Sequence, residues 1–186
     1  CMYPKDIIKA TFIPIGSERN EQLSDAVIAK PVIEKATMQQ FSDRKNYSWS
    51  NGTSVDVTEN GLLFHISGGK VISLQSSFYN NDNRGFRFSL TNGEKIFGTG
   101  ERSISLNRRG YRLNLNNAPA YGYSLNAEAL NFSVPFILSS ELYAIFFDNP
   151  SKGYLDIGKT DPSVLEYGVS SGELSFYIIP GAAYES

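Results

Sequence analysis

The sequence has little of several things that common protein functions need. Its 186 residues include one cysteine and one histidine. Cys1 alone excludes a disulfide within the chain and a zinc site made of several cysteines, and His65 alone excludes chemistry that needs two histidines. The formal net charge is −2, so the chain has no general electrostatic attraction for DNA or RNA, and we expect no nucleic-acid partner.

Long apolar runs are also missing. No stretch reaches the roughly 18 residues of a membrane span, and residues 1–6 have neither the basic nor the apolar region of a signal peptide. Hydrophobic residues nevertheless make up 41% of the chain and aromatic residues 13%. This composition predicts a globular domain with its own core rather than a disordered chain.

Alternating apolar residues predict strands along most of the chain. The clearest hairpin is at residues 62–75, where two alternating segments flank Gly68-Gly69, since both central residues of a tight two-residue turn need a positive φ. No segment has the period of a long helix. Further strands are predicted at 6–13, 86–90, 95–98, 111–115, 132–138, 142–147, 153–157, 164–169 and 173–179. We predict an all-β fold, an antiparallel β-sandwich or barrel with few or no helices.

Two segments have weaker patterns. Residues 26–33 are apolar, and Pro31 within them predicts an edge strand or an irregular strand. Residues 33–41 predict a short helical turn.

The glycines at Gly98 and Gly100 raise the question of a nucleotide site. A dinucleotide loop needs a third glycine where this chain has Ser103, and the acidic Glu101 stands where a phosphate would bind. No helical pattern follows. We therefore expect no cofactor, and we interpret the glycines as a tight bend or a close backbone contact.

Charged side chains offer a few other candidates. Asp148, Asp156 and Asp161 are candidates for glycosidase acid/base work, but aspartates at strand ends commonly bind the backbone of their own turn, so a structural role is favoured. The pair Arg108-Arg109 is compatible with phosphate binding, yet we expect it to be solvated or to meet a carboxylate of a neighbouring domain. His65 lies within a strand opposite the apolar positions, which predicts a solvent-facing or hydrogen-bonded histidine and no metal site.

Residues 114–123 have the composition that suits a sugar. Asparagine amides donate and accept hydrogen bonds at fixed angles, which matches neighbouring hydroxyls. Tyrosines add an apolar ring face with a polar end. An ordinary turn-rich loop has the same composition, and both interpretations stay open on local grounds.

Several segments resemble motifs of one enzyme family. Residues 97–102, Phe-Gly-Thr-Gly-Glu-Arg, are similar to the "YGxGER" signature in the N-terminal β-sandwich of glycoside hydrolase family 31. Residues 106–110, Leu-Asn-Arg-Arg-Gly, are similar to its "LNRRG" loop. Later strands of the family resemble residues 121–123, 131–136, 144–150 and 154–158. The motifs occur in the family's order and span nearly the whole chain.

This resemblance implies a galactose-mutarotase-like β-sandwich that precedes a (β/α)8 barrel. In the family the nucleophile and the acid/base are aspartates of that barrel, and neither motif is present, so no catalytic residue is assigned here. The expectation is a single non-catalytic domain, residues 1–186, truncated at both ends, of a retaining α-glycosidase of the α-glucosidase type. Its expected partners are the C-terminal catalytic barrel of the same polypeptide and an oligosaccharide substrate.

One departure from the family affects the candidate site. In many members an acidic residue in the loop after the "RRG" motif helps to line the substrate pocket, whereas residues 116–119 here read Asn-Asn-Ala-Pro. An acidic sugar contact is therefore not carried over. The substrate-binding candidates are Asn116, Asn117 and Tyr121.

Two other functions stay open, a free-standing carbohydrate-binding β-sandwich and a purely structural interface domain. Mutarotase chemistry resembles a glutamate base working with two histidines, which a chain with one histidine does not provide. The lack of disulfides leaves the compartment open. The low charge and the similarity of residues 26–31 to bacterial members favour a periplasmic or secreted location over a cytoplasmic one.

Overall fold

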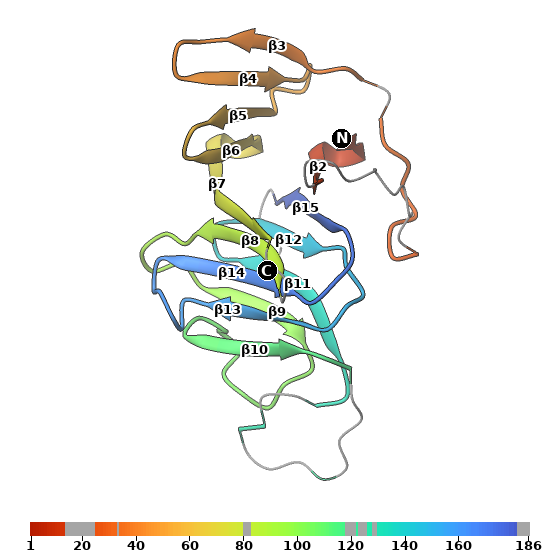
Figure 1. The fold of residues 1–186 in the computed structure, drawn as a ribbon, viewed down its shortest axis with the longest axis vertical. Coiled ribbons are helices and arrows are strands. Elements are labelled where there is room, and N and C mark those ends of the chain that lie inside the picture. Colours follow the sequence, from red (N-terminus) through yellow and green to blue (C-terminus); the bar gives the residue numbers. More distant parts are fainter. Residues whose placement is uncertain are drawn as a thin grey trace.

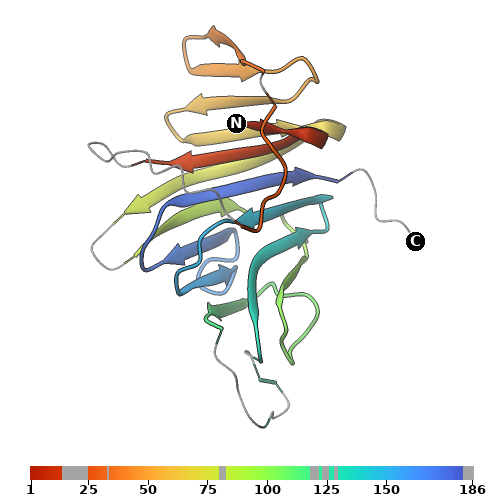
Figure 2. The ribbon, with the colours of Figure 1, turned by 90° about the vertical axis from the view of Figure 1, so that its right-hand side faces the viewer.

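The computed structural model describes residues 1–13, 25–32, 34–79, 83–117, 122, 126–127 and 130–181. These residues form two antiparallel sheets packed face to face (Figures 1 and 2). The strand order is β1-β2-β15-β12-β11-β9 in the six-stranded sheet and β10-β13-β14-β8-β7-β6-β5-β4-β3 in the nine-stranded sheet. The predicted all-β antiparallel sandwich is therefore confirmed.

The strands are short and follow one another through turns. The six-stranded sheet contains β1 (Met2–Tyr3), β2 (Ile7–Phe12), β9 (Ile96–Gly100), β11 (Ser133–Ser139), β12 (Tyr143–Phe147) and β15 (Leu174–Pro180). The nine-stranded sheet contains β3 (Thr37–Gln40), β4 (Arg44–Ser48), β5 (Ser54–Thr58), β6 (Gly61–Ile66), β7 (Lys70–Tyr79), β8 (Arg84–Ser89), β10 (Tyr111–Leu115), β13 (Gly153–Ile157) and β14 (Val164–Val169). Two single turns of 3-10 helix, η1 (Pro4–Asp6) and η2 (Ser67–Gly69), complete the described elements, and none of the described helices is long and apolar enough to cross a membrane.

The core between the sheets is rich in aromatic rings because alternate strand residues point inward. The ring of Phe176 in β15 packs edge-on against Phe86 and Phe88 of β8, with centroids 4.8 Å and 5.1 Å away. Phe147 of β12 stacks on Tyr167 of β14 at 4.1 Å. These contacts join the two sheets, and rings in such arrangements add to the stability that burial alone provides.

The predicted hairpin at 62–75 is present as β6 and β7. Gly68 and Gly69 both have a positive φ, 80° and 72°. The connection differs in length, because Ile66 pairs with Lys70 and three residues rather than two join the strands. The glycine pair therefore predicts the hairpin and its unusual backbone correctly, and the turn length wrongly.

Two predictions near the N-terminus are wrong. Residues 26–32 form no strand; the Val32 amide, which donates to the Met2 carbonyl oxygen at 2.8 Å, ties this segment to β1. Residues 37–40 form strand β3 rather than a helical turn. Strands β3 to β5 were not predicted as strands, and in Figure 1 they extend the nine-stranded sheet beyond the six-stranded one.

Candidate functional site

The glycine motif at 97–102 brings β9 unusually close to β11. Gly98 and Gly100 have φ values of 96° and 88°, and Thr99 between them has 73°. A Cβ atom on Gly98 would lie 2.6 Å from the Phe136 carbonyl oxygen, and one on Gly100 would lie 2.6 Å from that of Phe132. Both positions thus require glycine for conformation and for space, which confirms the predicted close backbone contact.

Arg102, at the end of this motif, fixes the neighbouring loop. Its guanidinium is buried, and its Nε donates to the Thr99 carbonyl oxygen at 3.1 Å. Its Nη2 donates to the Asn114 carbonyl oxygen at 2.9 Å and to the Ser133 Oγ at 3.2 Å. One side chain therefore holds the end of β10 against the start of β11, which sets the position of the residues that follow β10.

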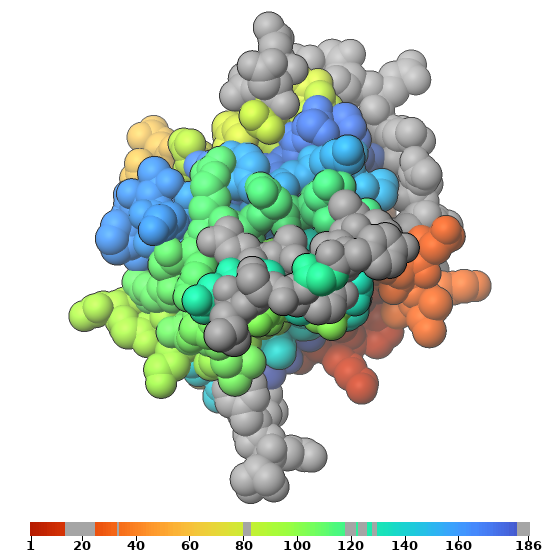
Figure 3. Space-filling model, turned by 90° about the horizontal axis from the view of Figure 1, so that it is seen from below, coloured from red at the N-terminus to blue at the C-terminus, as the bar shows by residue number. Residues whose placement is uncertain are grey.

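Asn116 and Asn117 are exposed at the end of β10. The Asn117 Oδ1 accepts a hydrogen bond from the Ser133 amide at 2.6 Å. Within the described part of the chain, neither the Asn117 Nδ2 nor the Asn116 amide has a hydrogen-bond partner. The two asparagines line a cavity of about 300 Å³, called the asparagine hollow below, together with Leu115, Ser133, Pro135, Asn149, Pro150, Ser151 and Lys152. Figure 3 shows the molecule from below, with the green segment that includes β10 at the surface.

The third candidate, Tyr121, lies outside the described residues. The structure thus brings two of the three candidates to one cavity, and substrate binding by all three stays a prediction. Sequence reasoning missed Ser133, Asn149 and Lys152 as neighbours of the hollow, because the chain brings them there from two other strand ends. One sequence signal pointed to this region. Arg102 belongs to the glycine motif at 97–102, but the motif alone does not show that Arg102 binds the end of β10 and Ser133.

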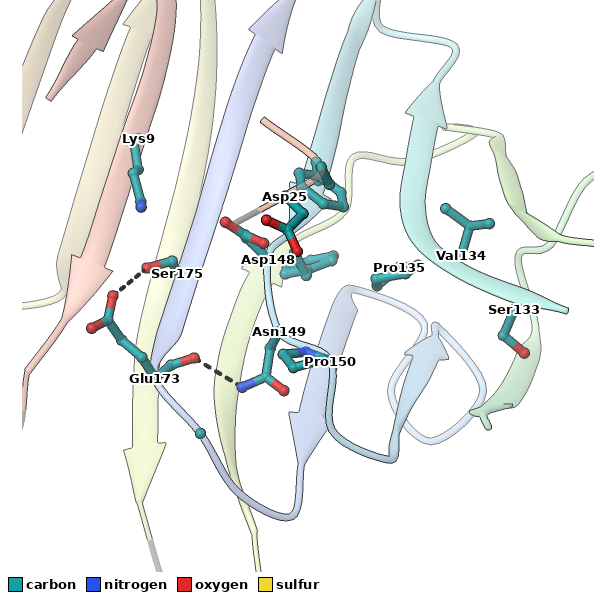
Figure 4. Close-up of a pocket in the computed structure, with 14 residues that line it drawn as sticks. Lys9, Asp25, Ser133, Val134, Pro135, Asp148, Asn149, Pro150, Glu173 and Ser175 are labelled. Atoms are coloured by element: carbon teal, nitrogen blue, oxygen red, sulfur yellow. Dashed lines mark hydrogen bonds between the residues drawn. The ribbon is translucent and has the colours of Figure 1, made fainter. Parts of the chain in front are cut away.

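A larger cavity of about 520 Å³ adjoins the asparagine hollow and shares Ser133, Pro135, Asn149 and Pro150 with it. Figure 4 shows its polar side chains: the carboxylates of Asp25 and Asp148 are directed into the same part of the cavity. The Glu173 Oε1 accepts a hydrogen bond from the Ser175 Oγ at 3.0 Å. Lys9 supplies a positive charge on the same wall.

Asn149 shapes the boundary between the two cavities. Its Nδ2 donates to the carbonyl oxygens of Ser171 and Glu173 at 2.9 Å each, and its Oδ1 accepts from the Ser151 amide at 2.7 Å. Each polar atom of the side chain thus has a backbone partner, so Asn149 fixes this loop rather than offering a free group to a ligand.

The three candidate carboxylates do not meet in one site. Asp161 accepts from the Ser163 amide and hydroxyl at 2.9 Å and 2.7 Å, which is the predicted turn role. Asp148 faces the larger cavity, and no hydrogen bond to its carboxylate is found among the described residues. Asp156 lies on the outer face of the nine-stranded sheet, on the side of β13 opposite the buried Leu155 and Ile157.

Asp156 is held as an ion by its neighbours. Burial alone would raise the pKa of its carboxyl group, but hydrogen bonds from Thr160, Arg112 and the Lys159 amide lower the pKa below its ordinary value. The Arg112 Nη1 lies 3.0 Å from the Asp156 Oδ2. A carboxylate so fully occupied stabilises the sheet and is not a free acid or base.

The predicted role is wrong for Arg108 and stays a prediction for Arg109. Arg108 is buried, and it donates to the carbonyl oxygens of Gly98, Ile104 and Ser105. Arg109 donates to those of Thr91, Glu94 and Pro162. Both guanidinium groups therefore bind carbonyl oxygens of the domain's own backbone; Arg108 does so largely out of contact with solvent, whereas Arg109 is partly exposed.

His65 behaves as the sequence predicts. Its Nε2 lies 3.0 Å from the Asp56 Oδ2, on the neighbouring strand. Asp56 also accepts from the Asn46 Nδ2 at 2.7 Å. The described residues contain no group of three or more His, Cys, Asp or Glu side chains arranged to hold a metal ion.

Comparison with known proteins adds an independent finding. The family model described as the glycosyl hydrolase 31 N-terminal galactose mutarotase-like domain matches residues 2–156. Over 171 residues, 89% of the chain, the sequence is 26% identical to an α-glucosidase from Saccharolobus solfataricus, of which it covers 21%. Over 92 residues, 50% of the chain, it is 28% identical to an α-xylosidase from Emericella nidulans, of which it covers 11%.

Solved structures give the same picture. A GH31 dextranase from Flavobacterium johnsoniae, solved with isomaltotriose, superposes with a TM-score of 0.85 at 25% identity over 96% of this chain and 23% of its own. A cycloalternan-forming enzyme from Listeria monocytogenes, at 16% identity and a TM-score of 0.81, shares the fold over 97% of this chain and 18% of its own. The chain thus spans about a fifth of the length of these structures and of the archaeal α-glucosidase.

Proposed function

Because the chain belongs to the family of N-terminal galactose mutarotase-like domains of glycosyl hydrolase 31, we propose that it is the non-catalytic domain of a retaining α-glycosidase of the α-glucosidase type. In this proposal it packs on the catalytic barrel of the same polypeptide and contributes residues 114–123 to the rim of the substrate pocket. The bond-breaking carboxylates belong to the barrel, which forms a covalent glycosyl intermediate and then hydrolyses it.

The observation that carries this proposal is the asparagine hollow. Asn116 and the Nδ2 of Asn117 are exposed amide groups at a cavity wall, and their strand end is clamped by the buried Arg102. Preorganised amides of this kind orient a bound sugar without reacting with it. The role expected of this chain is therefore to position one sugar ring against the catalytic groups.

The relatives support the proposed substrate class. The archaeal relative that matches 89% of the chain is an α-glucosidase, and the similar dextranase structure contains isomaltotriose. The shorter match is to an α-xylosidase. An α-glucoside is accordingly the proposed substrate, and an α-xyloside is the comparison substrate in any assay.

The test changes the hollow without changing the fold of the loop. In the full-length enzyme, Asn117→Asp keeps the acceptor for the Ser133 amide and removes the donor, while Asn116→Ala removes an amide that has no protein partner among the described residues. We expect each variant to raise KM for an α-glucoside about 2- to 10-fold, the equivalent of one hydrogen bond of about 0.5–1.5 kcal/mol. Asn60→Ala, an exposed asparagine in the β5–β6 turn, is the matched control. Unchanged kinetics in both hollow variants would contradict the positioning role.

A second experiment separates this proposal from a free-standing module. The chain of residues 1–186 and the full-length protein are compared in hydrolysis of a chromogenic α-glucoside, and calorimetry measures binding of glucosides to the chain alone. We expect activity only in the full-length protein and no tight binding by the chain. Activity of the chain alone would contradict the non-catalytic assignment and would direct mutagenesis to Asp148.

A further inference from the structure

The outer face of the six-stranded sheet has an aromatic row. One residue from each of four neighbouring strands lies in register across it: Lys9, Tyr177, Phe146 and Phe136. The rings of Phe146 and Tyr177 stack with centroids 5.9 Å apart. Phe136 and Phe146 are partly exposed, so the row presents ring surface to the outside of the sandwich.

More apolar side chains surround this row. On the outer side of β11, Val134 and Leu138 are each 37% exposed, and Phe132 just before it is 50% exposed. Residues 25–32 cross the same face, and Ile28 within them is 96% exposed. Of these residues, Ile28 and Val134 line a groove of about 410 Å³, called the apolar groove below, together with Tyr3, Phe136, Phe146, Tyr177 and Ile179. A contiguous apolar patch of this kind marks an interaction surface.

The apolar groove is continuous with the asparagine hollow. The cavity between them shares Val134 and Phe146 with the groove, and it shares Ser133 and Pro135 with the hollow. All three depressions follow the start of β11. A single body that covers the aromatic row therefore also reaches Asn117, which neither a small ligand nor a partner on the opposite sheet would do.

We propose that this outer face, from Ile179 and Phe136 to Val134, is the surface on which the catalytic part of the same polypeptide docks. The inference rests on the proposed function, which requires that the catalytic part meet the asparagine hollow. The similar α-glucosidase and dextranase are four to five times longer than the part this chain matches, so a body large enough to cover the face belongs to such enzymes. The face is apolar, as the core of a permanent interface is.

Hydroxyl-radical footprinting of the full-length enzyme tests the docking surface directly. Val134 on the proposed surface is compared with Val71, which is 51% exposed on the outer side of β7 in the other sheet. Without docking the two valines should differ by less than twofold, since labelling follows exposed area. With docking we expect Val134 to be labelled at least about fourfold less than Val71, because the core of such an interface is as closely packed as a protein interior.

Each outcome has one interpretation. Equal labelling of the two valines, or protection of Val71 instead, would overturn the docking surface. Protection of Val134 that disappears on dilution would assign the face to a second copy of the protein and would also overturn it. As a second readout, Val134→Glu should lower the melting temperature of the full-length enzyme, while Val71→Glu should leave it unchanged.

The experiment also distinguishes this inference from the proposed function. If the full-length protein hydrolyses α-glucosides but its Val134 is labelled as strongly as Val71, the proposed function is supported and the docking surface is contradicted. If Val134 is protected but the protein cleaves neither α-glucosides nor α-xylosides, the docking surface is supported and the proposed activity is contradicted.

Discussion

The two outer faces of the sandwich each carry a row of side chains that runs across neighbouring strands, but one row is mostly aromatic and the other is charged. Each has a row of four residues, one from each of four neighbouring strands, paired in register. On the six-stranded sheet the row is the aromatic one, from Lys9 to Phe136. On the nine-stranded sheet it consists of Arg112, Asp156, Glu166 and Arg87.

The charged row satisfies its own members. Arg112 lies 3.0 Å from Asp156, and the Arg87 Nε lies 2.5 Å from the Glu166 Oε2. Tyr154 also donates to the Glu166 Oε1 at 2.6 Å. Every carboxylate of this row has a partner within the sheet, so the charged row is satisfied without another domain. The aromatic row, in contrast, leaves ring surface of Phe136 and Phe146 partly exposed, and this difference supports the docking surface proposed above.

Among changes to the two rows, the largest loss of folding stability is expected when Asp156, the buried member of the charged row, is replaced. The Asp156 side chain is 3% exposed, whereas that of Arg112 is 46% exposed. Asp156→Ala removes the acceptor of Thr160, of the Lys159 amide and of Arg112, and should lower the free energy of unfolding by about 3 kcal/mol in a urea titration. Arg112→Ala should cost about 1 kcal/mol or less, because its partner keeps its other donors and the pair is half solvated. Equal costs for the two variants would contradict this account of the row.

The same residue gives a pH dependence with a definite sign. The folded pKa of Asp156 is lower than its unfolded value, so its contribution is fully present above the ordinary aspartate pKa of about 3.9 and is lost as the pH falls through the folded value. Asp156→Asn lacks this titration. In urea titrations the stability difference between the wild type and this variant should therefore shrink as the pH is lowered below about 4. A difference that stays constant down to pH 2 would contradict the pKa shift.

The sequence predicted the fold well where periodicity decides it. The strands at 111–115, 153–157 and 164–169 have the predicted bounds, because each alternates buried and outward residues between clear turns. The four residues of β3 are all exposed, so that strand has no apolar period to detect. Residues 26–29 are apolar for a different reason: they line a groove on the outside of a sheet, and composition does not distinguish that from a strand.

The candidate site was predicted in part. Asn116 and Asn117 were selected by resemblance and by the chemistry of amides, and the structure places both on one cavity. Arg102 and Ser133 were missed because their contact joins the ends of two strands that are far apart in sequence. The contacts of Arg109 were missed for the same reason, since the carbonyl oxygens that it binds include those of distant loops. Contacts of this kind depend on how the strands are ordered in the sheets, and local sequence patterns carry no information about that order.

The smallest effect on stability is expected on the proposed docking face. Val134→Ser on the outer side of β11 should change the free energy of unfolding of residues 1–186 by no more than about 0.5 kcal/mol, because the domain's own core does not use this side chain. Ile137 lies on the same strand, is fully buried and points into the core, so Ile137→Ala should cost about 3 kcal/mol. Urea titration of the two variants measures the difference between the faces of a single strand. Should Val134→Ser destabilise the chain as much as Ile137→Ala, the outer face would be part of the domain's own core, and its exposed apolar surface would no longer indicate a partner.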